Sequence, residues 1–218
     1  MRFVFTKEVF ELGVRGVYFN IFGMQNRASS DPAVEAFVDA RIEKMPPELE
    51  NSPVLKGFEE LHAAVSSKAQ KLVSAPAGLL SFYRNRGDIP RINGIVDVYN
   101  AVSISTGIAV GAHDLKHVEG DIALRLTKGD ENFHPLGSQT PGRVSAGEYA
   151  YVDGRGDILC RLEVRQGDKT KITPESSDVF FIVQGHASAD PAVTQNAAKD
   201  LIAACTEIFG GTVEQLYP

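Results

Sequence analysis

The spacing of apolar residues changes along the chain, and this change sets the fold class. In the earlier part, apolar side chains recur every three or four positions, which is the period of a helix buried on one face. From Ile108 onwards the period falls to two, in short runs separated by Gly- and Asp-rich turns, which indicates half-buried strands. A final helical pattern closes the chain. We therefore predict an α+β fold with helices mostly early and strands mostly late.

One repeated tetrapeptide places two helix starts. Asp-Pro-Ala-Val occurs over residues 31–34 and again over 190–193. An Asp that caps a first turn containing Pro is typical of a helix N-terminus. The first helix is expected to end before Pro46 and Pro47, and the second before the glycine pair at 210–211. The tetrapeptide therefore marks two helices and not a domain repeat.

The remaining elements follow from the same patterns. A third amphipathic helix is expected over 58–72, with His62 on its apolar face, where a core histidine is commoner than a ligand. Residues 14–22 could supply an early strand. The later strands are expected over 122–126, 149–151, 158–164 and 179–183. No long linker divides the chain, so we expect a single domain over residues 1–218.

Charge limits the kind of partner. The chain has 28 acidic and 22 basic residues and a net charge of -6. Proteins that coat DNA or RNA neutralise phosphates with Lys and Arg, so the acidic balance argues against that class and requires any RNA contact to be local. The best local patch is Arg84, Arg86 and Arg91, which lie near two aromatic residues. It is either a solvated loop or a contact for phosphates and bases.

The N-terminal segment and the cysteines indicate the compartment. Charged residues interrupt the first 24 positions, so we expect neither a signal peptide nor a membrane-spanning helix. Cys160 and Cys205 fit neither a redox pair nor a zinc site, and we interpret both as buried thiols. A cytoplasmic protein without membrane contact is expected.

A polar stripe lies inside the apolar segment 91–103. Asn93, Asp97 and Asn100 recur there at helical spacing. Burying three such side chains costs free energy unless each finds a hydrogen-bond partner. The stripe therefore lines either a hydrogen-bonded helix junction or a polar pocket, and physical chemistry alone favours the junction.

A glycine followed by titratable residues forms a second candidate site. Gly111 would let a ligand or another backbone approach closely, and His113 and Asp114 follow it. His113 and His117 are four residues apart, but the segment is not the helix that an HExxH zinc site requires. We therefore expect no metal and no cofactor. From its position alone, His113 is either a surface or core histidine or a site histidine.

A third candidate is the alternating segment 160–165. As a strand it would place Arg161, Glu163 and Arg165 on one face, either as solvated ion pairs or with Glu163 binding a cationic substrate group. A GxSxG elbow, a phosphate loop, a GxGxxG fingerprint and an obvious catalytic Cys-His pair are all missing from the sequence. Covalent hydrolysis and nucleoside triphosphate chemistry are therefore not favoured.

The order of these motifs resembles the B3/B4 domain of the bacterial phenylalanyl-tRNA synthetase β subunit, and more closely the freestanding (solo) proteins built from that domain alone. The resemblance covers residues 81–218. Its motifs lie at 91–100, Gly107, 111–114, 118–128, 133–137, 156–161, 169–173, 178–185 and 190–211.

The resemblance implies a fold and an activity. The fold would be two-lobed, with mixed or antiparallel sheets flanked by helices and a pocket between the lobes; residues 1–80 would be mainly helical and 81–218 would form the editing core. The activity would be trans-editing: deacylation of a mischarged aminoacyl-tRNA, for example tyrosyl-tRNA(Phe) or canavanyl-tRNA(Arg). The partners would be the tRNA acceptor end and a free or esterified amino acid.

The resemblance and the residues together give a hypothesis for the site. His113, which would orient or deprotonate water, and Asp114 would be catalytic. The substrate would be bound by Asn93, Asp97, Asn100, Gly111, Arg161 and Glu163, and the tRNA by Arg84, Arg86 and Arg91. The acidic pocket residue of the synthetase would fall at about Ile182, which cannot polarise water. A noncatalytic tRNA- or protein-binding module and an amino-acid-binding sensor stay open as alternatives.

Overall fold

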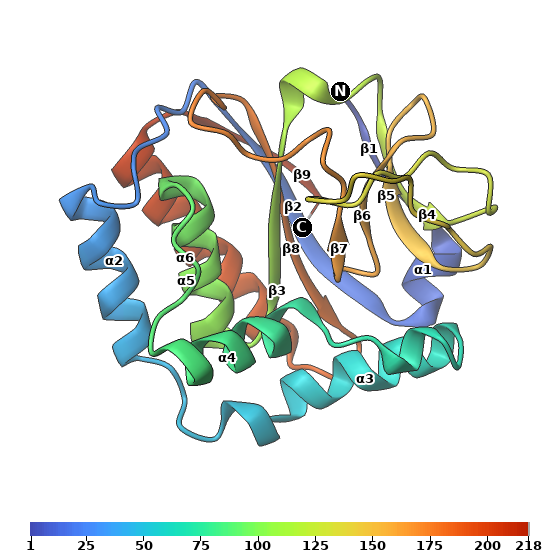
Figure 1. The fold of residues 1–218 in the computed structure, drawn as a ribbon, viewed down its shortest axis with the longest axis horizontal. Coiled ribbons are helices and arrows are strands. Elements are labelled where there is room, and N and C mark those ends of the chain that lie inside the picture. The colour runs from blue at the N-terminus through green and yellow to red at the C-terminus, as the bar shows by residue number, and fades with distance from the viewer. Residues whose placement is uncertain (218) are drawn as a thin grey trace.

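Two β-sheets stand side by side in the computed structural model, which describes residues 1–217 (Figure 1). The four-stranded sheet has the order β3 (Ala109–Asp114), β8 (Val179–His186), β2 (Val14–Phe22) and β9 (Thr212–Tyr217), and its neighbours are antiparallel. The five-stranded sheet has the order β1 (Phe3–Phe5), β4 (Ile122–Leu126), β5 (Tyr149–Val152), β6 (Ile158–Arg161) and β7 (Arg165–Gln166). Only its β1–β4 pair is parallel.

Helices cover the four-stranded sheet and the lower end of the molecule. The α-helices are α1 (Lys7–Leu12), α2 (Pro32–Glu43), α3 (Pro53–Val65), α4 (Ala75–Arg86), α5 (Gly94–Thr106) and α6 (Pro191–Phe209), and the 3-10 helices are η1 (Leu49–Asn51), η2 (Ala69–Lys71) and η3 (Leu115–His117). In Figure 1, α2, α5 and α6 lie on the left of the four-stranded sheet, while α3 and α4 run below. None of the helices in residues 1–217 combines the length and apolarity needed to cross a bilayer.

Strand β8 connects two hydrophobic cores because both of its faces are covered. All of its residues are buried. Successive side chains of a strand point to opposite faces. Phe181 therefore packs in the core shared with α5 and α6, whereas Phe180 and Ile182 pack in a second core with Tyr149 and Tyr151 of the facing sheet. The predicted α+β fold, with two sheets flanked by helices, is confirmed.

The two predicted helix starts are confirmed by their caps. The Asp31 carboxylate accepts the Ala33 N–H at the start of α2, and the Asp190 carboxylate accepts the Ala192 N–H at the start of α6, both at 2.9 Å. The early strand predicted over 14–22 is also present, as β2.

The helix predicted over 58–72 is wrong in its second half. Helix α3 ends at Val65, and Ser66 is extended. The chain then folds back through η2, which brings the Leu72 carbonyl oxygen to 3.3 Å from His62 Nδ1. The apolar spacing continued past the true end because both segments bury residues in the same core.

The strand predicted over 158–164 is wrong beyond Arg161. Leu162 and Glu163 have φ values of 52° and 46°, in the left-handed region, so the chain reverses and β7 pairs with β6. Alternation along one strand therefore does not describe this segment. Leu162 is fully buried, and Glu163 is held by buried hydrogen bonds, so tertiary contacts impose a turn on a strand-like pattern.

Candidate functional site

A cavity of about 160 Å³ lies between the two sheets. Strands β3 and β8 supply Gly111, His113 and Ile182, and the facing sheet supplies Tyr151 and, from the turn between β6 and β7, Glu163. A cavity of roughly 150 Å³ is large enough for a benzene-sized group. The space therefore suits a small chemical group and not a folded partner.

The local geometry of β3 explains why it lines the cavity. Ala109, Gly111 and His113 alternate with core residues and so point toward the facing sheet. A Cβ placed on Gly111 would meet no heavy atom within 4 Å, so the missing side chain leaves open space beside the backbone. Gln166 closes one side by donating from Nε2 to the Ala112 carbonyl oxygen at 3.1 Å.

His113 is a buried and neutral imidazole. It is 1% exposed, and its Nδ1 lies 2.9 Å from the Thr170 hydroxyl. Burial lowers the pKa of His113 to about 3, so the ring carries no charge near neutral pH. Thr170 is itself fixed, because its carbonyl oxygen accepts the Asp114 N–H at 2.9 Å. One ring nitrogen is thus held by protein, which leaves the other for a ligand.

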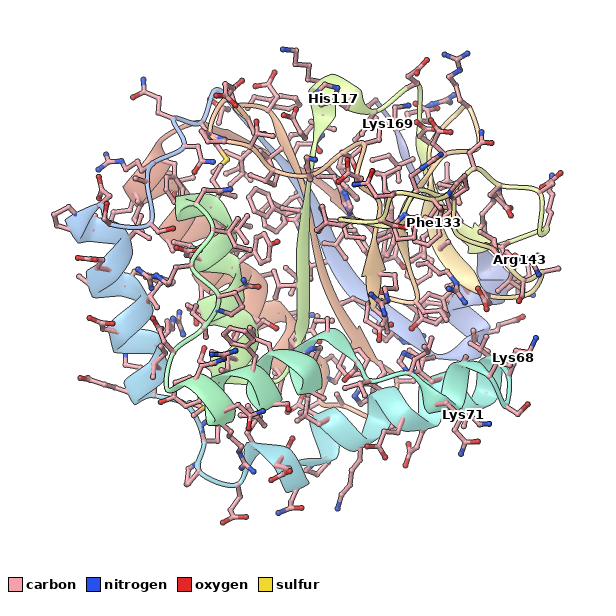
Figure 2. All side chains as sticks on the ribbon, in the orientation of Figure 1. Lys68, Lys71, His117, Phe133, Arg143 and Lys169 are labelled. Carbon is pink, nitrogen blue, oxygen red and sulfur yellow. The ribbon has the colours of Figure 1, made fainter. Side chains whose placement is uncertain are left out.

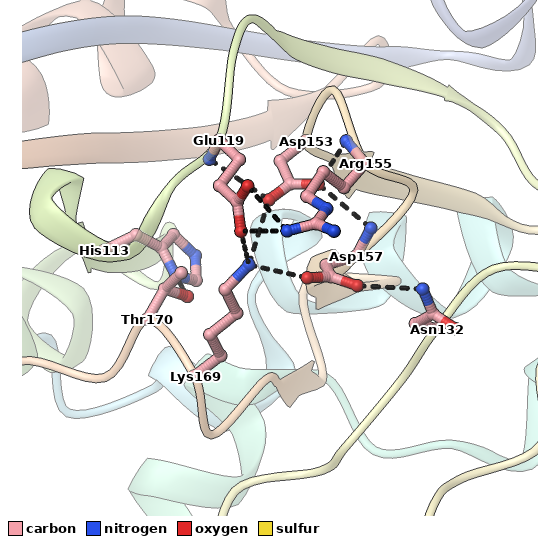
Figure 3. A network of polar contacts seen from close by, with 8 residues as sticks. All are labelled: His113, Glu119, Asn132, Asp153, Arg155, Asp157, Lys169 and Thr170. Atoms are coloured by element: carbon pink, nitrogen blue, oxygen red, sulfur yellow. Dashed lines mark hydrogen bonds and ion pairs between the residues drawn. The ribbon is translucent and has the colours of Figure 1, made fainter.

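An ion-pair network anchors the segment that carries Thr170 (Figure 3). The Lys169 ammonium lies 2.6 Å from Asp157, 3.2 Å from Glu119 and 3.5 Å from Asp153. Three carboxylates from two separate turns therefore hold one lysine. The arrangement fixes the backbone beside His113 from the solvent side.

The buried neutral state of His113 predicts acid sensitivity. The pKa of His113 is lower in the folded chain than its unfolded value of 6.5, so above pH 6.5 its titration does not change the free energy of unfolding. As pH falls below 6.5, the unfolded chain binds the proton more readily, and the fold is destabilised. We expect His113 to cost about 2 kcal/mol of the free energy of unfolding between pH 8 and pH 5. Urea unfolding should show this loss for the wild type and a smaller one for His113→Gln. Equal losses in both proteins would contradict it.

Glu163 is the carboxylate of the cavity. Its Oε1 lies 2.7 Å from His62 Nε2, while Oε2 accepts from the Tyr149 hydroxyl and from Gln184 Nε2, the latter at 3.3 Å. Burial raises the pKa of Glu163. Burial lowers the pKa of His62, but the hydrogen bond and the negative charge of Glu163 outweigh this effect and raise it overall.

Comparison with known proteins identifies the family. Residues 59–210 match the family model of the B3/4 domain. The chain belongs to the B3/4 domain family. It is 25% identical, over an alignment 234 residues long, to the phenylalanine–tRNA ligase beta subunit of Corynebacterium glutamicum, covering 94% of this chain and 28% of that subunit. The resemblance predicted from the sequence is confirmed.

A solved structure supports the same fold. The N-terminal fragment of the phenylalanyl-tRNA synthetase beta subunit from Pyrococcus horikoshii matches with a TM-score of 0.57 and 12% identity, covering 97% of this chain and 50% of that one. The B3/4 chain thus spans half of that fragment and less than a third of the curated subunit. At this identity the likeness concerns the fold alone.

The structure brings only part of the predicted polar stripe to the cavity. Asn100 lines it. Asn93 instead caps α5, accepting the Val96 N–H at 3.3 Å, and Asp97 accepts the Ile92 N–H at 2.8 Å. Neither Asn93 nor Asp97 lines the cavity. These two side chains form the hydrogen-bonded junction that the sequence left open as an alternative.

Asp114 also lies outside the cavity lining. Its carboxylate accepts the Lys116 N–H at 2.9 Å and the Ser176 hydroxyl at 2.5 Å, which starts η3 and ties it to the segment before β8. The geometry gives Asp114 a structural task, next to His113 in the chain but facing elsewhere.

The predicted basic residues are distributed over separate places. Arg161 forms a bidentate pair with Glu148 and faces away from the cavity. Arg91 lies 3.4 Å from Asp97. Arg84 pairs with Glu50, and Arg86 is exposed at the end of α4. Contact of Arg84, Arg86 and Arg91 with tRNA stays a prediction.

Neither cysteine offers a nucleophile. Cys205 is buried as predicted, whereas Cys160 is half-buried and lines the cavity, and both are free thiols. Burial raises the pKa of Cys160, which keeps it protonated. Among residues 1–217, no group of three or more His, Cys, Asp or Glu residues could hold a metal ion.

Sequence reasoning missed the partners of Glu163. His62 was interpreted correctly as a core histidine, but its pairing with a residue 101 positions away left no trace in the local pattern. Tyr149, in β5, was predicted only as a strand residue, and Gln184, in β8, lies one position beyond the strand predicted over 179–183. A buried carboxylate needs several donors, and that requirement was the one signal available.

Proposed function

We propose that this B3/4 protein is a trans-editing hydrolase that removes a wrong amino acid from a mischarged tRNA. The observation that carries the proposal is the cavity, where a neutral imidazole and a buried carboxylate flank an open stretch of backbone at Gly111. The relatives named as phenylalanyl-tRNA synthetase β subunits act on tRNA, which makes an aminoacyl ester a natural ligand.

His113 would orient the attacking water. A neutral imidazole can accept a hydrogen bond from water through the nitrogen that Thr170 leaves free. An aminoacyl ester is activated, so positioning is most of the task, and good positioning supplies about 7 kcal/mol or more. Backbone N–H groups beside Gly111 would stabilise the developing oxyanion. Asp114 would support this geometry through its bonds to Lys116 and Ser176 and would not touch the ester.

Glu163 would bind one donor group of the substrate. A carboxylate has about four acceptor positions, and the three donors His62, Tyr149 and Gln184 already use most of them. At most one further hydrogen bond is free for a ligand. A bidentate hydrogen bond to a guanidinium group would have to displace one of the protein donors. Glu163 is therefore better suited to bind a substrate hydroxyl or a single N–H group.

The proposal is tested by hydrolysis of a panel of mischarged tRNAs. The panel contains tyrosyl-tRNA(Phe) and canavanyl-tRNA(Arg), with phenylalanyl-tRNA(Phe) and arginyl-tRNA(Arg) as correctly charged controls. We expect the protein to accelerate the loss of one mischarged ester and to spare the controls. If the folded protein accelerates the hydrolysis of none of these esters, the proposed hydrolase is contradicted and a noncatalytic tRNA-binding module is favoured.

Gly111→Val tests whether the reaction takes place in the cavity. Because a Cβ at this position meets no atom within 4 Å and the backbone is not in the left-handed region, the variant should keep the wild-type melting temperature. Its side chain would occupy the cavity, so the selective deacylation should be lost. A fully active Gly111→Val protein would place the reaction elsewhere.

A further inference from the structure

A second hollow, of about 400 Å³, is lined by three arginines. We call it the arginine groove and define it by Arg143, Arg161 and Arg165, with Phe133 and Leu136 of the preceding loop. Figure 2 shows Phe133 and Arg143 in front of the five-stranded sheet, with Arg143 toward the outer margin of the molecule. Of the residues that the structure describes, none that lines the groove is acidic.

The charges of the groove are only partly balanced. Glu148 neutralises Arg161 through a bidentate pair. Arg165 stands directly across from Arg161 in the β6–β7 pairing, and like charges in that position repel. Within residues 1–217, neither Arg143 nor Arg165 takes part in an ion pair, and both are exposed. In a chain of net charge -6, two free guanidinium groups over one hollow form a local site for anions.

The groove and the cavity share one hairpin. Cys160 and Gln166 face the cavity, whereas their neighbours Arg161 and Arg165 face the groove, because successive strand residues point to opposite sides. Strand β7 is the last strand of its sheet, and the loop segment 134–136 lies along its outer edge, where the Leu136 N–H donates to the Gln166 carbonyl oxygen at 2.8 Å. Because Gln166 is hydrogen-bonded on this edge to Leu136 and to Ala112, a flexible chain lying in the groove would reach the cavity by passing beside Arg165.

We propose that the arginine groove binds backbone phosphates of the single-stranded acceptor end of tRNA and directs its terminal ester into the cavity. The proposal rests on the proposed function for its choice of partner. Guanidinium groups match phosphate oxygens in geometry and charge. Leu136, which is 50% exposed on the same hollow, offers apolar contact to a base. The patch predicted from the sequence is less suited, because Arg84 and Arg91 already have acidic partners.

Binding of uncharged tRNA tests the groove without any hydrolysis. The double variant Arg143→Ser/Arg165→Ser is compared with Lys68→Ser/Lys71→Ser, which removes two exposed lysines that line neither the groove nor the cavity, and each variant lowers the net charge of -6 by two further units. Fluorescence anisotropy is recorded over a salt series, with intact tRNA and with tRNA that lacks its single-stranded 3′ end. We expect the groove variant to bind intact tRNA about tenfold more weakly, with a salt slope reduced by about 1.4 for two single-strand phosphates. The control variant should bind like the wild type.

The shortened tRNA assigns the contact to the acceptor end. Wild type should bind it as weakly as the groove variant binds intact tRNA, and the groove substitutions should then have no further effect. Equal weakening by both double variants, or an unchanged effect of the groove variant on shortened tRNA, would overturn the proposal, as would a wild type that binds neither RNA. If tRNA binding follows the expected pattern while no ester in the hydrolysis panel is lost faster with the protein, the proposed groove is supported and the proposed hydrolase is contradicted.

Discussion

His113→Ala should lower the rate of aminoacyl-tRNA deacylation by about 100-fold or more, the usual range for a side chain that handles the proton of an attacking water. Among residues 1–217, the ring is the one imidazole that lines the cavity, and its Nδ1 lies 2.9 Å from the Thr170 hydroxyl. Since the lost interaction would be made in the transition state, kcat should fall while KM changes little. Single-turnover hydrolysis of the substrate found in the panel measures this directly.

The chain supplies a matched control for this substitution. His117 lies four residues further on, exposed in η3 and outside the cavity, so His117→Ala should keep the wild-type rate. His113→Gln keeps a polar group beside Thr170 and separates loss of chemistry from loss of packing. Thermal unfolding of each variant checks the fold. A folded His113→Ala protein with unchanged kcat would leave water positioning to the backbone near Gly111.

The pH profile adds a second test of the same residue. Because the pKa of His113 is about 3, its ring stays neutral from pH 5 to pH 8. We therefore expect no titration of His113 in the rate over that range. A step in kcat near pH 6.5 that disappears in His113→Gln would show that the ring titrates as an exposed histidine does, which its buried position excludes.

Local chemistry was sufficient to predict the starts of α2 and α6 and, within residues 1–217, five of the nine strands. The Asp31 and Asp190 caps act on residues two positions away, so the sequence contains the whole interaction. Gly111 and His113 could be proposed because a glycine that allows close approach and a titratable side chain lie two residues apart, and β3 then places both on one face. Features of this kind depend on neighbours in the chain.

The features that the sequence could not supply depend on distant contacts. The turn at Leu162 and Glu163 interrupts an alternating pattern because the carboxylate binds His62, 101 residues away, and Gln184, 21 residues away. Asp97 and Asp114 look like site residues in the sequence, and only the structure shows that backbone N–H groups occupy their carboxylates. Residue type indicates a candidate site, but the fold decides which polar groups are left free.

The largest loss of stability is expected from His62→Leu. The His62 side chain is 0% exposed and that of Glu163 is 3% exposed, so removing the imidazole leaves a buried carboxylate without its charged partner. Breaking one side of a buried pair costs about 3–5 kcal/mol. Urea unfolding at pH 6.5 measures the loss. His62→Gln, which keeps a hydrogen-bond donor, should lose less.

The pH dependence of this loss separates charge from packing. Without His62, the carboxyl pKa rises further, and a raised pKa stabilises the fold at low pH and costs stability as pH increases through it. In the folded chain the raised pKa of His62 keeps one proton on the pair, whereas the unfolded pair holds about one proton at pH 5 and about half a proton at pH 6.5, so the wild-type stability changes through this pair by only a few tenths of a kcal/mol. His62→Leu should therefore lose less at pH 5 than at pH 6.5. Adding Glu163→Gln removes the charge and should abolish that difference; the same loss at both pH values, with or without Glu163→Gln, would mean that His62 contributes packing alone.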